Sequence, residues 1–596
     1  MPLLMSHKGT QPHCSVPPID TTFLIVHTGH HHTIPSGTTT SMVQKSRRSF
    51  GSRSTIPSRH QDISKLANMK LSFDPKACAH NHRHPLLWLW SWIFLSMDKT
   101  LVVGLAPPSV ATSPPPIRRV AVIGSGVAGL SVAHALTHAS SPLPLELSIF
   151  EAKATLDVKA GAGVQLNGGL SALYRMNPSL GKAVQAAGVT LAGIHARAAP
   201  ISNDNHPSRE PSSDATSWET LLQLNVPQIV RQNKAAAATL LRDNADNDEL
   251  LWTCILRGTL QQVLRDTLPQ PLRRKIACKK ALINLTPSPD NGILCHFADG
   301  STAGPFDLVV GADGVNSACK QFVTSGKIEA DVNRRRQAFY AGMRIRYAVV
   351  EKPVPKATET TPPQYILEQF LDSGAYGLIG SYGAGAKQKP VQCGVSVTLD
   401  PGYLGPFRKP QQAQSTKEAD ENVDWAPTEV ADKSMTQIPL PVVSVMEAAD
   451  RSIELGVYYH NPFSPWSRSM SDKRDSMVVL CGDAAHAFPP FLGQGANQAI
   501  QDAYCLAQKV TQYNEAVVRG GNVDEETPSL AKLLKEYENT RWPGTFSILW
   551  KSLFLGYLET GGPDGFYATF RNIFFKITGF LGIARKVLLD SAVPKL

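Results

Sequence analysis

Three glycines in the stretch 119–151 place the strongest constraint on how this chain can fold. Gly124, Gly126 and Gly129 stand at G-x-G-x-x-G spacing. The β-branched run Val120–Ile123 before them predicts a buried parallel strand, and Leu130–Leu136 after them predicts a helix. Such a strand, loop and helix begin a doubly wound α/β domain.

Each glycine has a physical role in this pattern. Gly124 allows a tight turn, Gly126 lets a pyrophosphate approach the backbone, and Gly129 lets the helix pack closely on the strand. The helix N-terminus offers free N–H groups and a partial positive charge to phosphates. Glu151 stands 22 residues after Gly129, near the ~20 expected for an acid on ribose hydroxyls. The unit predicts an adenine dinucleotide site and leaves FAD and NAD both open.

Two further motifs follow at the ends of predicted strands. Asp313 and Gly314 lie in G-A-D-G-V-N-S, and Asp483 and His486 begin the string G-D-A-A-H-A-F-P-P-F-L-G-Q-G-A-N-Q-A-I-Q-D-A. An Asp at a strand end can accept hydrogen bonds from sugar-alcohol hydroxyls. The glycines after Pro489 allow close backbone approach, and they open a helix whose N-terminus favours the electron-rich edge of a reduced flavin.

Together these motifs resemble the class A FAD-dependent monooxygenases, the para-hydroxybenzoate hydroxylase-like family that includes zeaxanthin epoxidases, salicylate hydroxylases and kynurenine monooxygenases. The resemblance implies an α/β fold, with a Rossmann-type FAD-binding domain, a β-sheet substrate domain and a helical C-terminal tail. The expected limits are a leader at 1–117, the FAD-binding domain at 118–335 and 472–545, the substrate domain at 336–471, and amphipathic helices at 546–596.

The resemblance also implies roles for individual residues. Glu151 is expected at the adenosine ribose of FAD, and Arg257 at the ribityl–pyrophosphate region. Asp313 and Gly314 are expected to serve both FAD and NAD(P)H, and Asp483 to bind ribityl and pyrophosphate oxygens. The residues expected beside the isoalloxazine are Pro489, Gly493, Gly495 and Asn497.

Two positions depart from the family pattern. Ser317 is followed by Lys320 where the family often has S-x-x-R, and Lys lacks the planar fork of donors of Arg. His460-Asn461-Pro462 stands where Arg-x-Pro is common. Both departures bear on the contacts expected for the nicotinamide.

The implied reaction begins with hydride transfer from NAD(P)H to FAD. Reduced FAD then traps O2 as a C4a-hydroperoxide, which hydroxylates or epoxidises a hydrophobic aromatic or isoprenoid substrate. No protein nucleophile is required, and His486 is expected to support its loop rather than act as a base. Two alternatives stay open: a flavin-dependent reductase or dehydrogenase of the same fold, and a non-enzymatic FAD-binding protein.

Charge and cysteine content argue against a nucleic-acid-binding protein, a cysteine metal site and a disulfide-stabilised fold. The formal net charge is +10, but residues 1–117 hold eleven Lys/Arg against four Asp/Glu, so most of the excess lies in the predicted leader. We therefore expect no nucleic-acid partner. The nine cysteines form no C-x-x-C pair, so neither a metal site nor a disulfide framework is expected. The acid-poor leader is typical of a plastid or mitochondrial transit peptide, or of an over-long start to a cytoplasmic protein.

The last fifty residues are apolar with interleaved cations. Phe574, Phe575, Phe580 and Leu581 stand among Arg571, Lys576, Arg585 and Lys586, a pattern typical of a basic amphipathic helix. Such a helix could contact a membrane peripherally or pack against the FAD-binding domain, and the sequence leaves both readings open.

Overall fold

A computed structural model describes eleven stretches of the chain. They are residues 115–156, 161–199, 218–242, 248–329, 337–351, 365–372, 374–399, 438–471, 474–520, 528–561 and 565–596. The predicted leader 1–117 lies outside these residues except for its last three. The order of elements confirms the predicted α/β fold class.

A mostly parallel sheet forms around the glycine motif. Among the described residues it has six strands, and all neighbours are parallel except the antiparallel pair β19–β20. The order is β19 (Ser467–Ser471), β20 (Arg474–Leu480), β13 (Leu308–Gly311), β1 (Arg119–Ile123), β2 (Glu146–Phe150) and β9 (Ile276–Ala277). The helix predicted after the glycines is α2 (Val127–His138), and α13 (Gly495–Val518) packs beside it.

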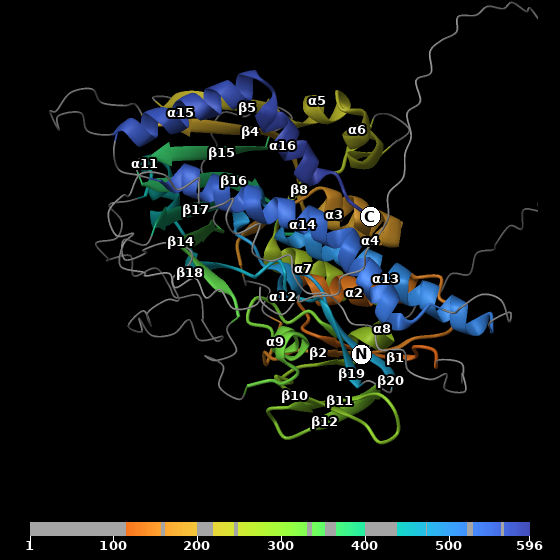
Figure 1. Cartoon of the computed structure of the whole chain (residues 1–596). Helices are drawn as coiled ribbons and strands as arrows, with labels where there is room; N and C mark the ends of the chain where they lie inside the picture. Colours follow the sequence, from red (N-terminus) through yellow and green to blue (C-terminus); the bar gives the residue numbers. More distant parts are fainter. Residues whose placement is uncertain are drawn as a thin grey trace, which may run out of the picture. The chain divides into compact units, whose positions relative to one another are not determined.

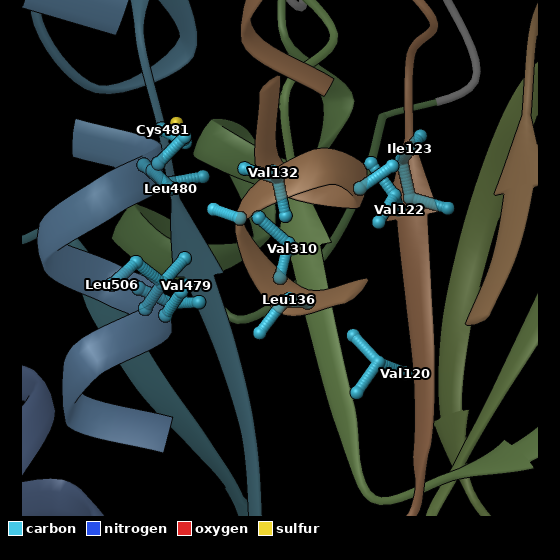
Figure 2. Packing of buried hydrophobic residues seen from close by; sticks show 14 of the residues in the cluster. Val120, Val122, Ile123, Val132, Leu136, Val310, Val479, Leu480, Cys481 and Leu506 are labelled. Carbon is cyan, nitrogen blue, oxygen red and sulfur yellow. The ribbon is translucent and has the colours of Figure 1, made fainter. Parts of the chain in front are cut away.

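The core of this part lies between the sheet and these two helices. Val122 of β1 and Val310 of β13 are fully buried, because apolar β-branched residues fill a sheet that is covered on its face. Figure 2 shows Val132 and Leu136 of α2 near Val310, with β20 and Leu506 of α13 alongside. The core therefore fixes the loops that leave the carboxyl ends of the strands.

A second, larger sheet has nine strands among the described residues. Its order is β18 (Arg451–Tyr459), β14 (Phe339–Val350), β17 (Val391–Leu399), β16 (Ala375–Tyr382), β15 (Tyr365–Asp372), β4 (Val189–Ala198), β8 (Thr253–Leu256) and β3 (Gly163–Leu166), with β5 (Glu219–Asn225) pairing to β4. Figure 1 shows these strands together. Strands within 163–256 thus join the sheet of the predicted substrate domain, so the predicted boundary at 335/336 does not separate the two sheets.

The C-terminal helices also differ from the predicted limits. α14 (Leu530–Thr560) runs across the expected boundary at 545/546. Its first turns pack on the first core through Leu534 and Tyr537, and its later turns pack on the second sheet through Leu549 and Leu553. Two further helices follow, α15 (Gly565–Phe580) and α16 (Ile583–Ala592). In the described part of the chain, every helix falls short of the length and apolar character that a bilayer-spanning helix needs.

The remaining elements connect these parts. Strands β10 (Leu282–Pro287), β11 (Ile293–Phe297) and β12 (Thr302–Phe306) form a small antiparallel sheet, and β6 (Leu241–Arg242) pairs with β7 (Glu249–Leu250). The other helices are α3 (Gly168–Met176), α4 (Pro178–Ala187), α5 (Val226–Arg231), α6 (Lys234–Leu240), α7 (Arg257–Asp266), α8 (Gln270–Arg273), α9 (Ala318–Ser325), α11 (Leu440–Glu447), α12 (Asp483–His486) and the 3-10 turn η3 (Pro490–Leu492).

Candidate functional site

The three motifs meet at the carboxyl ends of four parallel strands. Ile123 of β1 pairs with Phe150 of β2 and Gly311 of β13, and Gly311 pairs with Leu480 of β20. The motif residues follow these four positions directly in the chain. In open α/β sheets, ligands bind at this edge.

The glycine loop divides into two close contacts and one open position. Gly124 has φ +100°, and a Cβ there would lie 2.4 Å from the Ala312 carbonyl oxygen. A Cβ on Gly129 would lie 1.9 Å from the Gly124 oxygen. A Cβ on Gly126 would meet nothing within 4 Å. Gly124 and Gly129 therefore allow the protein to pack, whereas Gly126 borders open space.

Glu151, which is expected at the ribose, lies against the glycine loop. Its Oε2 accepts hydrogen bonds from the backbone N–H of Ser125 at 2.9 Å and the Ser125 hydroxyl at 2.5 Å. Its Oε1 accepts from the Lys153 N–H at 3.0 Å. Gln261 of α7 donates to the Ser125 carbonyl oxygen at 2.8 Å. The acid and α7 thus hold the loop from two sides.

Arg257 begins α7 and presents an exposed side chain. A Cβ on Gly161 would lie 2.9 Å from Arg257 Cδ, so the absence of a side chain at Gly161 leaves room for the arginine stem. The guanidinium also acts electrostatically on Tyr347 of β14, where it lowers a pKa that burial raises to about 12. Arg257 therefore lies beside Gly161 and near Tyr347 of the second sheet.

Asp313 stabilises the turn of its own motif. It accepts hydrogen bonds from the Ser317 hydroxyl at 2.5 Å, the Ala318 N–H at 2.8 Å and the Cys319 N–H at 3.2 Å. Burial raises the pKa of Asp313, and these donors oppose the rise. Gly314 has φ +78°, and a Cβ there would meet nothing within 4 Å. The open position of the D-G motif is therefore the glycine, while the carboxylate caps α9.

Asp483 is the exposed acid of the third motif. It is the first residue of α12, and its Oδ1 lies 4.0 Å from where a Cβ on Gly495 would stand. No residue in the described ranges donates a recorded hydrogen bond to its carboxylate. Asp483 is thus available to a ligand at the start of α13, unlike Asp313.

The loop between Pro489 and α13 is held from inside by Asn497. Its Oδ1 accepts from the N–H groups of Asn167 at 2.8 Å and Gly169 at 2.9 Å, and its Nδ2 donates to the oxygens of Gln165 and Gly493. Its side chain is fully buried and all its hydrogen-bonding capacity is used. Asn497, which is expected beside the isoalloxazine, thus uses its side chain to shape the loop.

Gly493 and Pro489 have the conformations that the loop needs. Gly493 has φ +61° and ends η3, which lies between the two residues. Pro489 is buried, and Gly495 begins α13. The loop thereby reaches the N-terminus of the long helix α13.

His486 contacts a carboxylate that the sequence reading did not single out. His486 Nε2 lies 2.6 Å from Asp502 Oδ2, and the same oxygen accepts the Gly482 N–H at 3.0 Å. Arg541 of α14 donates to Asp502 Oδ1 at 2.8 Å. Burial would raise the pKa of Asp502, but His486 and Arg541 hold it below its usual value. The charge network supports the G-D turn, as expected for His486.

The two departures from the family pattern lie together and buried. Lys320 Nζ donates to the Ala485 oxygen at 2.9 Å, and a His460 ring nitrogen lies 2.9 Å from the Val315 oxygen. Burial lowers the pKa of Lys320 to about 8 and, with Lys320 beside it, that of His460 to about 3. Both residues thus join the D-G turn to the G-D turn.

No group of His, Cys, Asp and Glu in the described part of the chain has the composition of a metal site. Residues 305–521 match a family model described as an FAD binding domain. The chain is 27% identical over 452 residues to 3-amino-4-hydroxybenzoate 2-monooxygenase PtnB3 of Streptomyces platensis, which covers 75% of this chain and 89% of the relative.

Other relatives and solved structures agree. The chain is 27% identical over 263 residues to a salicylate hydroxylase of Pseudomonas putida, covering 41% of this chain and 50% of the relative. Its fold is similar to Klebsiella pneumoniae HpxO complexed with FAD and uric acid, with a TM-score of 0.55, 20% identity, and coverage of 80% of this chain and 97% of that one. This similarity to a solved structure concerns the fold alone.

Proposed function

We propose that this chain is a class A FAD-dependent monooxygenase, and that it uses NAD(P)H and O2 to hydroxylate or epoxidise a hydrophobic aromatic or isoprenoid substrate. The observation that carries this proposal is the meeting of the three motifs at one sheet edge, beside an apolar face of the second sheet.

The residues at this edge fit FAD. Gly126 and Gly314 leave open space next to backbone, and Asp483 offers an exposed carboxylate at the start of a helix. We propose that Glu151 holds the adenosine ribose and that Arg257 and Asp483 hold the ribityl–pyrophosphate region. When bound, FAD supplies a flavin that accepts a hydride from NAD(P)H and then activates O2.

The D-G turn and the loop before α13 would complete the flavin site. Asp313 keeps the turn in shape, so Gly314 is the position we propose for close approach of the cofactor or the nicotinamide. Pro489 and the backbone of Gly493–Gly495 would lie beside the isoalloxazine, with the N-terminus of α13 favouring negative charge on the reduced ring.

An apolar face of the second sheet supports a hydrophobic substrate. Met343 and Ile345 of β14 belong to one buried cluster, and Phe488 and Phe491 of the G-D motif pack against it. The rings of Tyr376 and Phe491 lie 5.8 Å apart. Sites that bind small apolar molecules have such walls with few polar groups, and exclusion of water protects reactive oxygen species there.

The half-buried phenol of Tyr347 and the buried phenol of Tyr376 supply those polar groups. Burial raises the pKa of Tyr347 to about 12 and that of Tyr376 well above its usual value. Both hydroxyls stay protonated at neutral pH and can donate to a substrate oxygen. We propose that they orient the substrate at the flavin side of the sheet. A peripheral membrane contact of the C-terminal helices would give a lipophilic substrate access to the same face.

A spectrum of the purified full chain tests this function. We expect a flavin band that bleaches with NADPH or NADH under argon and returns with air. With a panel of lipophilic arenes and isoprenoids under labelled O2, one labelled oxygen is expected in the product. Reduction of a substrate without label would establish the reductase alternative, and a flavin band indifferent to both nicotinamides would establish FAD binding without this activity.

A further inference from the structure

One face of the last helices is apolar and exposed. We define the apolar stripe as Phe570, Ile573, Ile577, Phe580, Leu581 and Ile583, on α15, α16 and the turn between them. Phe580 is 91% exposed and Leu581 62% exposed. The spacing of the first four residues by three or four positions places them on one side of α15. Large apolar residues gathered in this way mark an interaction surface.

The opposite face of α15 fixes the helix on the protein. Arg571 is 1% exposed and donates to the carbonyl oxygens of Leu371 at 3.4 Å and Asp372 at 2.7 Å. Phe575 is buried in the cluster of the second sheet, and Lys576 pairs with Glu219 of β5. Figure 1 shows α15 along β5, which it contacts. The helix has therefore already buried its own core side, and the apolar stripe is the side left over.

Every charge carried by residues 565–589 is positive, and Lys576 among them is paired with Glu219 of β5. The chain contains no Asp or Glu from Gly565 to Leu589. The exposed charges in that segment are Lys576, Arg585 and Lys586. Arg571, the other cation, is buried. A surface partner must therefore accept apolar side chains in its middle and cations around them.

We propose that the apolar stripe docks on an anionic membrane surface, with its apolar side chains among the acyl chains and the exposed cations Arg585 and Lys586 at the headgroups. Amphipathic helices with cationic polar faces bind lipid interfaces in this way. Anionic lipids attract each nearby Lys or Arg. A second copy of the chain fits less well, because a symmetric interface would bring these cations against each other.

The location also gives the docked helix a function, and this step rests on the proposed function. Phe570 and Phe554 both lie near Phe574, at ring distances of 6.4 and 5.7 Å. Phe574 packs against the cluster that holds Phe575, Leu553 and the substrate-facing side of the second sheet. A lipophilic substrate leaving the bilayer would meet a continuous apolar surface from the apolar stripe to that sheet.

Vesicle flotation of the full chain tests the docking. We expect the protein to float with phosphatidylcholine vesicles containing phosphatidylserine, more than with phosphatidylcholine alone, and less as salt rises. The double variant Phe580→Ser/Leu581→Ser should lose binding roughly tenfold or more. Its matched control is Phe463→Ser, which removes a 57% exposed phenylalanine from another segment.

A charge exchange gives a second, independent measurement. Lys586→Glu should weaken binding to the anionic vesicles, whereas Arg274→Glu, at an exposed residue just after α8, should leave it unchanged. The inference is overturned if the wild type stays unbound at low salt, or if the double variant floats as the wild type does. A concentration-dependent dimer lost in the double variant, without vesicle binding, would also overturn it. Flotation requires no turnover. Failure of docking is therefore measured by flotation, and failure of the proposed reaction by the flavin spectrum and product analysis.

Discussion

Asp502 of α13 and Arg541 of α14 form a fully buried ion pair, with 2.8 Å between Oδ1 and Nε. The other oxygen of Asp502 binds Gly482 and His486, so one carboxylate joins α14 to the G-D turn. Arg541 in turn donates to the Gln498 side chain at 2.6 Å and to the Lys595 carbonyl oxygen at 2.6 Å. The turn that carries Asp483 is therefore braced from behind by groups that cannot reach a ligand.

Asp502→Asn should destabilise the protein strongly. The amide keeps the size of the carboxylate but leaves the Arg541 charge buried and unpaired, which costs about 3–5 kcal/mol. Denaturant unfolding of the FAD-free protein measures the loss. Asp290→Asn, at an exposed residue of the β10–β11 turn, is the control and should change stability by less than about 0.5 kcal/mol. Equal stability of the two variants would contradict the bracing role.

Gly124→Ala and Gly126→Ala should separate folding from cofactor binding. The first methyl would lie 2.4 Å from the Ala312 oxygen at φ +100°, so we expect a loss of about 1–3 kcal/mol in unfolding free energy. The second methyl meets nothing within 4 Å, so FAD-free stability should hold while FAD affinity falls roughly tenfold or more. Unfolding curves and flavin titration measure the two effects. Unchanged FAD affinity in Gly126→Ala would remove the pyrophosphate from this loop.

Asp483→Ala should weaken FAD binding without unfolding the chain. The residue is exposed and is the open carboxylate of the third motif, and a hydrogen bond to a charged group contributes about 1.5–3 kcal/mol. We expect the FAD dissociation constant to rise roughly tenfold or more. The measurement is flavin fluorescence titration, with Asp290→Ala as control. Full FAD retention in the variant would show that Asp483 does not contact the cofactor.

His460 should make stability depend on pH below neutrality. Its pKa falls from 6.5 to about 3 in the folded state, chiefly through burial and also through Lys320 and His486. The unfolded chain then binds more protons between these values, so stability falls as pH drops from about 6.5 towards 3. His460→Gln should flatten this slope by up to about 1.4 kcal/mol per pH unit.

The slope is measured by denaturant unfolding at several pH values. His134, with a pKa lowered to about 4 mainly by burial, contributes a separate slope that remains in the variant. His296→Gln, on the small antiparallel sheet, is the control and should keep the full slope. Parallel slopes for wild type and His460→Gln would contradict the assignment.

The sequence predicted the motif residues at the sheet edge better than the buried residues that hold them in place. Gly124, Glu151 and Asp483 were found because each follows an apolar strand at a recognisable spacing, and the parallel sheet brings such positions together. Asp502 and Arg541 could not be paired, because 38 residues separate them along the chain and no local pattern records a contact between two helices.

The second sheet shows the same limit. A β-sheet domain was expected at 336–471, but β4 and β8 were not expected to join the sheet that its strands form. β4 lies parallel to β15, which is far along the chain, and strand partners at such distances depend on packing rather than on local sequence. Lys320 and His460 were recognised only as departures from the family pattern, since the burial of a side chain cannot be seen in a motif.

The order of strands in the first sheet has a consequence for folding during synthesis. β1 lies beside β13, and β13 takes β20 as its other neighbour, although β20 begins more than three hundred residues after β1. On the ribosome, β1 and α2 are made first and β13 follows. The second edge of β13 stays unpaired until β20 has been synthesised as far as Leu480. During that interval the nascent chain exposes unpaired strand edges, which is the condition that chaperones relieve.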